Sequence, residues 1–267
     1  MYAIVSLTAL LAILPVAPFA HKLPSTFYIV LALIGILAVI YNTLSFPFTP
    51  QSAFKTAYWQ QADLQGGNST VTLTGVQPYL GHVLKEVPSV DYDGVSWRKG
   101  PERGLTSAQF PSVAPRSFPN LPMSKWMDIE VERTGMSSLL IRISGKDTRA
   151  CRLRFHGGYN VSQVLVRGSN RDGYELPSPA PVKNVDLWKR TWNGTWEVEL
   201  ELAAPSSSRD PAIDTAEILR GRASCIWSDR TNGRIPTLDE LYVFSPTWAT
   251  MTAWETGLVE GWKEFSV

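Results

Sequence analysis

The longest apolar stretch of the chain lies near its N-terminus, where residues 23–54 contain no charged side chain. Its centre, residues 27–44, is almost entirely apolar. About 20 such residues in a helix cross the roughly 30 Å hydrocarbon core of a bilayer, and lipid requires the backbone to be hydrogen-bonded within the segment. The pattern predicts a transmembrane helix over residues 26–45. The alternative is a buried core helix of a soluble protein, although such helices are usually shorter and carry a polar face.

A second uncharged stretch occupies residues 1–20. A signal peptide is one interpretation, but the stretch lacks a basic start, and Pro18 interrupts the small-residue cleavage pattern. A first membrane helix over residues 2–17, stopped by proline, fits better. We therefore predict a transmembrane helical hairpin over residues 1–48 and a juxtamembrane segment over residues 49–65.

After this region, apolar and polar residues alternate with a period of two. In residues 150–156, for example, Cys151, Leu153 and Phe155 share one face, and two arginines share the other. Runs of this kind separated by turn residues are typical of antiparallel sheets with one solvated face. The runs cover residues 70–75, 126–133, 138–144, 150–156, 161–167, 185–192, 195–202 and 220–228. They predict an antiparallel β-sandwich or jelly-roll-like domain over residues 66–267, so the expected fold class is two transmembrane α-helices followed by a mainly β domain.

Two regions depart from this alternation. Residues 85–125 contain five prolines between 101 and 122, which predicts an irregular excursion. The last part of the chain, from residue 236, is expected to hold a short helix near 238–241 and an aromatic tail.

Charge and cysteine content narrow the class of protein. The net charge of +1 predicts no nucleic-acid partner. The only two cysteines are Cys151 and Cys225. They can form one disulfide in an oxidising lumen or remain as small buried thiols, because sequence does not fix the distance between them.

Three sequons bear on the side of the membrane that the β domain occupies. Asn68, Asn160 and Asn193 each begin an Asn-x-Ser/Thr sequence with no proline in the middle, so each is a glycosylation candidate if the domain is lumenal. Lys22, between the two predicted helices, also favours a lumenal domain. Positively charged links tend to lie on the cytosolic side, which would put the N-terminus and the long C-terminal domain in the lumen.

The sequence offers no recognisable catalytic machinery. Of the three histidines, His82 and His156 stand without a metal-ligand motif, and no serine-nucleophile motif occurs. A zinc site needs three or four ligands at characteristic spacing. We therefore predict no catalytic residue and no metal ligand in this chain.

The C-terminal sequence GLVEGWKEFSV, residues 257–267, resembles the end of the vacuolar membrane proteases, which are multi-spanning zinc metallopeptidases of fungi. Similar pieces occur in the same order, at residues 18–22, 41–42, 46–48, 71–75, 149–153, 187–192, 221–225 and 235–236. The resemblance implies the last two membrane helices and the C-terminal lumenal β domain of such a protein, located at the vacuolar membrane. It places the zinc ligands and the catalytic carboxylate in an N-terminal domain with no counterpart here, so no cofactor is expected on this chain.

Two functions follow as expectations. The first is a non-catalytic C-terminal portion of a vacuolar membrane zinc metallopeptidase, which supports or docks the peptidase domain. Its partners would be the lipid bilayer and the peptidase and membrane segments of the parent protein, and the abrupt apolar start favours a fragment. The alternative is a stand-alone membrane-anchored lumenal glycoprotein that binds a protein or a carbohydrate. A hydrolase that uses His82 or His156 is the least favoured possibility.

Overall fold

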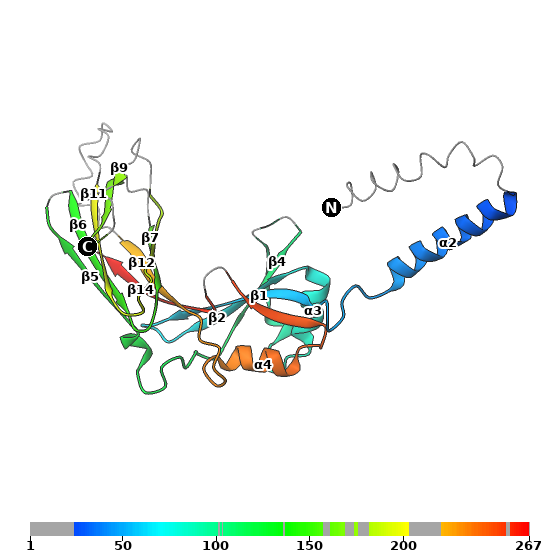
Figure 1. Cartoon of the computed structure of the whole chain (residues 1–267). Coiled ribbons are helices and arrows are strands. Elements are labelled where there is room, and N and C mark those ends of the chain that lie inside the picture. The colour runs from blue at the N-terminus through cyan, green and yellow to red at the C-terminus, as the bar shows by residue number, and fades with distance from the viewer. Residues whose placement is uncertain are drawn as a thin grey trace, which may run out of the picture. The chain divides into compact units, whose positions relative to one another are not determined.

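A computed structural model of the chain describes residues 24–100, 102, 104–135, 137–156, 161–168, 174–175, 182–202, 220–254 and 257–266. The chain divides into two compact units, Met1–Phe48 and Thr49–Val267. In the first unit, helix α2 spans Ser25–Leu44 (Figure 1). The helix ends where the Ser45 backbone N–H donates to the Tyr41 carbonyl at 2.8 Å.

The prediction of two membrane-spanning helices is corrected. Crossing a bilayer demands both sufficient length and sustained apolar character. Among the residues that the structure describes, no helix has enough of both to span a membrane. The first of the predicted helices, over residues 2–17, lies outside the described residues.

The second unit is mainly β and contains two sheets (Figure 1). The larger sheet consists of β1 (Phe54–Asp63), β2 (Ser69–Gly75), β3 (Ser96–Lys99), β4 (Thr106–Pro111), β7 (Ala150–His156), β10 (Asn184–Trp188), β12 (Arg220–Trp227), β13 (Ala249–Ala253) and β14 (Val259–Ser266). Its spatial order is β10-β7-β12-β14-β1-β2-β4-β3, and β13 also pairs with β1. The smaller sheet has the order β5 (Met127–Arg133), β6 (Ser138–Gly145), β11 (Thr195–Leu202), β8 (Val161–Val166) and β9 (Tyr174–Glu175).

The larger sheet is mixed, which corrects the prediction of a wholly antiparallel domain. Strand β1 pairs in parallel with β13 along its first half and with β14 along its second half. Trp254 and Gly257 form a bridge between β13 and β14. The last two strands thus run beside β1 as one interrupted strand. The smaller sheet is antiparallel throughout its described pairs.

The two sheets share a core where β5 of the smaller sheet lies against β12 and β14 of the larger sheet (Figure 1). The expected alternation holds in β7, where Cys151, Leu153 and Phe155 are buried. Gly145, at the end of β6, permits the close approach, because a Cβ there would lie 3.0 Å from Cys225 Sγ. Burial of these inward faces removes apolar surface from water, which is the main stabilising contribution to such a domain.

Part of the region predicted to be irregular has regular structure. Just before that region lies helix α3 (Gln77–Lys85), which the alternation did not predict and which buries Leu80, Val83 and Leu84. Strands β3 and β4 and two short 3₁₀ helices, η2 (Tyr92–Gly94) and η3 (Met123–Lys125), follow. Near the C-terminus, helix α4 (Pro236–Phe244) includes the short helix expected at 238–241.

A buried glutamine holds the chain after β4 against the larger sheet. Gln60, on β1, is fully buried. Its Nε2 donates to Ser69 Oγ and to the Val113 carbonyl, both at 2.8 Å, and its Oε1 accepts from Tyr58 Oη at 2.8 Å. These bonds satisfy a buried amide that would otherwise be costly, and they fix the path of the loop that leads to the cavity described below.

Candidate functional site

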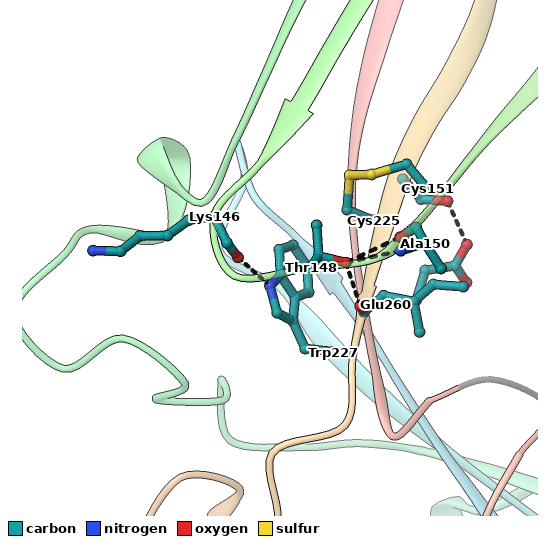
Figure 2. The surroundings of a disulfide bond; sticks show 9 residues. Lys146, Thr148, Ala150, Cys151, Cys225, Trp227 and Glu260 are labelled. Atoms are coloured by element: carbon teal, nitrogen blue, oxygen red, sulfur yellow. Dashed lines mark hydrogen bonds between the residues drawn. A yellow bond between two sulfur atoms is a disulfide. The ribbon is translucent and has the colours of Figure 1, made fainter. Parts of the chain in front are cut away.

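A disulfide joins β7 and β12, two neighbouring strands of the larger sheet (Figure 2). The antiparallel register of β7 and β12 places Cys151 directly opposite Cys225, with their Cα atoms 4.0 Å apart. Both residues are buried. The sequence left a disulfide and free buried thiols as alternatives, and the structure has the disulfide.

The turn between β6 and β7 is fastened to the end of β12 next to this disulfide. The Thr148 hydroxyl donates to the Ile226 carbonyl at 2.7 Å, and Trp227 Nε1 donates to the Lys146 carbonyl at 2.8 Å (Figure 2). The side chain of Lys146 extends away from the disulfide (Figure 2). The turn therefore has a fixed backbone, and its exposed side is available to line a site.

Three aromatic rings pack edge-to-face beside the same turn. The centroid of Trp126 lies 5.3 Å from Phe118 and 5.7 Å from Trp227, and the Phe118 and Trp227 centroids are 6.3 Å apart. Trp126 and Trp227 are buried, whereas Phe118 is half-buried. Such edge-to-face arrangements are favoured by the quadrupoles of the rings.

A cavity of about 620 Å³ opens above this aromatic cluster. It is lined by residues 117–121, 146–147, 192, 227–229 and 234. Its volume falls in the range of about 300–1,000 Å³ that is typical of small-ligand sites. Two cations, Lys146 and Arg234, and two carboxylates, Asp147 and Asp229, balance its charge. The lining therefore suits a ligand with apolar faces and hydrogen-bonding groups rather than a highly charged one.

Trp192 forms an exposed wall of the cavity. Its side chain is 55% exposed, and the Arg149 guanidinium lies 3.8 Å from the centre of its ring. The next residue, Asn193, is also exposed, and its Oδ1 accepts a hydrogen bond at 3.1 Å from the backbone N–H of Asp147. The sequon asparagine is therefore held at the cavity rim.

Asp229, another residue of the lining, has a lowered pKa that favours its ionised form. The hydrogen bond from the Thr231 hydroxyl to Asp229 Oδ1, at 2.6 Å, is the main cause that lowers the pKa of this carboxyl. Partial burial opposes the shift, while the Thr231 backbone N–H and the charge of Arg234, 3.8 Å away, add to it. Arg234 in turn donates to the Ser117 carbonyl at 2.9 Å, so the pair ties two lining segments together.

The lowered pKa of Asp229 predicts that the unfolding free energy falls slightly at acid pH. A carboxyl with a lowered pKa in the folded state stabilises the fold above its unfolded-state value, and that contribution is lost as pH falls through the folded pKa. Unfolding free energy falls between about pH 6 and about pH 3, and we expect Asp229→Asn to make this fall smaller by about 0.2–0.5 kcal/mol. The effect is small because the side chain is 41% exposed and solvent-screened. Urea titrations at several pH values measure this change, and an identical pH slope in both proteins would contradict it.

A buried carboxylate on β14, that of Glu260, lies outside the cavity lining. Glu260 is 1% exposed, and its carboxylate accepts from Ser224 Oγ at 2.6 Å and from Gln61 Nε2 at 3.1 Å, with Arg154 Nη2 at 3.6 Å. Because the Glu260 carboxylate is hydrogen-bonded and ion-paired within the fold, no ligand is needed to explain its burial.

The sequence-derived site residues lie apart from one another. Asn68 is exposed in the turn between β1 and β2, where its carbonyl accepts from the Asp63 N–H at 2.8 Å. Asn160 lies outside the described residues. His82, on α3, and His156, at the end of β7, are exposed. The described part of the chain holds no group of three or more His, Cys, Asp or Glu side chains placed to bind a metal.

The fold and its cavity define a disulfide-linked β domain, and the comparisons give its family. Residues 54–260 match the model of the vacuolar membrane protease C-terminal domain. The chain belongs to the vacuolar membrane protease family, as its resemblance in sequence predicted. The family name associates it with the vacuolar membrane. No solved structure matches the chain.

Curated relatives carry the same family name. The vacuolar membrane protease of Aspergillus niger is 33% identical over 282 residues, an alignment that covers 99% of this chain and 28% of the relative. Those of Emericella nidulans and Paracoccidioides brasiliensis (strain Pb18) are 34% and 32% identical, cover 99% and 100% of this chain, and each match over 28% of their own length. The chain thus spans somewhat more than a quarter of the length of these relatives.

Proposed function

We propose that this chain is a non-catalytic module of a vacuolar membrane zinc metallopeptidase, and that its β unit docks against and stabilises the peptidase part of that protein. The observation that carries the proposal is the match over residues 54–260 to a C-terminal domain model, within a chain that corresponds to 28% of the relatives' length. A disulfide-linked unit is suited to support chemistry performed elsewhere in such a protein.

The β unit is lumenal in this proposal. A disulfide persists in an oxidising compartment, and the structure has one buried in the core. Two of the three sequon asparagines, Asn68 and Asn193, are exposed and lie in turns, where a glycan can be accommodated. The partners we propose are the membrane surface and the peptidase and membrane-embedded parts of the parent protein.

Deleting residues 49–267 from the gene is expected to lower metal-dependent peptidase activity in isolated vacuolar membranes by about tenfold or more. The physical reason is linkage, because a peptidase fold loses stability when a partner that binds only its folded form is removed. Activity on an unstructured peptide, normalised to membrane protein, measures the effect.

A variant with only Trp188→Ala is the matched control, because this side chain is 62% exposed and its loss leaves the unit folded. Peptidase activity that is unchanged after the deletion would contradict the docking role. It would favour the alternative of a binding glycoprotein, which the aromatic and polar cavity also suits.

A further inference from the structure

We propose that the cavity lined by Phe118, Asp147 and Trp192 binds the chain's own N-glycan, which is attached at Asn193. The inference rests on the lumenal placement proposed above, since only a lumenal chain is glycosylated at its sequons. It goes further by assigning the occupant of the cavity as the proximal sugars of one particular glycan.

The attachment point is held at the edge of the cavity. The Asp147 N–H donates to Asn193 Oδ1 at 3.1 Å, and Asp147 is itself a lining residue. N-glycosylation modifies Nδ2 and leaves Oδ1 as an acceptor, so this bond survives in the glycoprotein. The identity of the amide atoms follows from chemistry, because a backbone N–H requires an oxygen opposite it.

The lining presents the groups that a sugar ring requires. Apolar C–H faces of a sugar bind the electron-rich face of an aromatic ring, and Trp192 and Phe118 supply such rings in the wall and floor. Arg149 stacks on Trp192 and fixes the orientation of the indole. Around the rings, Asn120, Asp147 and Ser228 offer donors and acceptors for hydroxyl and acetamido groups.

The covalent link favours binding of this attached glycan in the cavity over binding of a free sugar. A ligand linked by a short tether has an effective concentration in the millimolar range. A sugar with only weak intrinsic affinity therefore occupies the cavity when it is attached at the rim. The residue next to the attachment point is itself the exposed tryptophan, which otherwise leaves 55% of its surface in water.

Site-resolved deglycosylation of the native full chain tests the proposal. The chain is produced in a yeast secretory pathway, treated with endoglycosidase H under native conditions, and sampled over time for peptide mass spectrometry. We expect release at Asn193 to be at least about tenfold slower than at Asn68, which corresponds to about 1.4 kcal/mol. Asn68 is an internal reference, because it is exposed in the β1–β2 turn and does not line the cavity.

Trp192→Ala is expected to bring release at Asn193 to the Asn68 rate while both sites remain glycosylated. Trp188→Ala removes a comparably exposed tryptophan from β10 that does not line the cavity, and it should leave the protection unchanged. Equal rates at the two sites in the unmodified chain would overturn the proposal, as would protection that survives Trp192→Ala. If Asn68 is glycosylated and the glycan at Asn193 is not protected, only the binding of the glycan in the cavity is rejected. If neither site carries a glycan, the lumenal placement is rejected as well.

Discussion

Replacing both cysteines, as Cys151→Ala/Cys225→Ala, is expected to lower the unfolding free energy of the full chain by about 2–5 kcal/mol. The disulfide closes a loop across a sequence separation of 74 residues, and the entropy of closing such a loop in the unfolded state is on the order of 4 kcal/mol. That loop contains β8, β9, β10 and β11, three of which belong to the smaller sheet. The crosslink therefore limits the conformations that this segment can adopt in the unfolded chain.

Thermal unfolding followed by circular dichroism measures this effect, and the midpoint should fall by roughly 5–15 °C. Dithiothreitol provides the control. It should lower the midpoint of the unmodified chain by a similar amount and leave the double variant unaffected. A midpoint that differs by less than about 2 °C between the two proteins would show that the crosslink adds no stability.

The alternation of residues predicted the strands in which one face is buried and the other is solvated. The runs at 138–144, 150–156, 195–202 and 220–228 correspond closely to β6, β7, β11 and β12. In β11, Trp196, Val198 and Leu200 are buried as their spacing indicated. Each of these strands packs an apolar face on the shared core, so a period of two is imposed on its sequence.

The direction of pairing could not be predicted from the same pattern. Alternation does not record whether strands pair in parallel or antiparallel, and the parallel partners of β1 lie about 200 residues away along the chain. Within the C-terminal tail, β13 and β14 were not predicted, because burial does not alternate along them: Met251 alone is buried in β13, and three successive residues are buried at the start of β14. Sheet order depends on contacts between segments that are distant in sequence, which local patterns do not record.

The residues of the candidate site were even harder to predict from the sequence than the sheet order. Its residues come from the loop before β5, the β6–β7 turn, the segment after β10 and the end of β12. Trp192 was assigned to a strand over 185–192, but β10 ends at Trp188, which leaves Trp192 in a turn beside the cavity. The available signals were the Asn193 sequon and the position of a tryptophan next to it. Nothing in the sequence indicated that Asp147 would hold that asparagine at the cavity rim.

Replacing Trp227 with alanine is expected to cost about 3–5 kcal/mol of unfolding free energy. The side chain is 3% exposed and packs edge-to-face against Trp126 and Phe118. It also approaches Gly261 so closely that a Cβ on that glycine would lie 2.9 Å from Trp227 Cζ3. The substitution would leave a large void between the sheets and remove the floor of the cavity. Urea unfolding followed by circular dichroism measures the loss.

Two matched variants separate the contributions of this tryptophan. Trp227→Phe retains a ring but leaves the Lys146 carbonyl without the indole N–H, so we expect an intermediate loss of about 1–3 kcal/mol. Trp188→Ala removes the same side chain from an exposed position on β10 and should change stability by less than about 0.5 kcal/mol. Equal losses for Trp227→Ala and Trp188→Ala would contradict the packing described here. If the aromatic cluster joins the β6–β7 turn to the core and thereby holds the cavity open, the three variants should lose unfolding free energy in a fixed order. The loss should be largest for Trp227→Ala and smallest for Trp188→Ala.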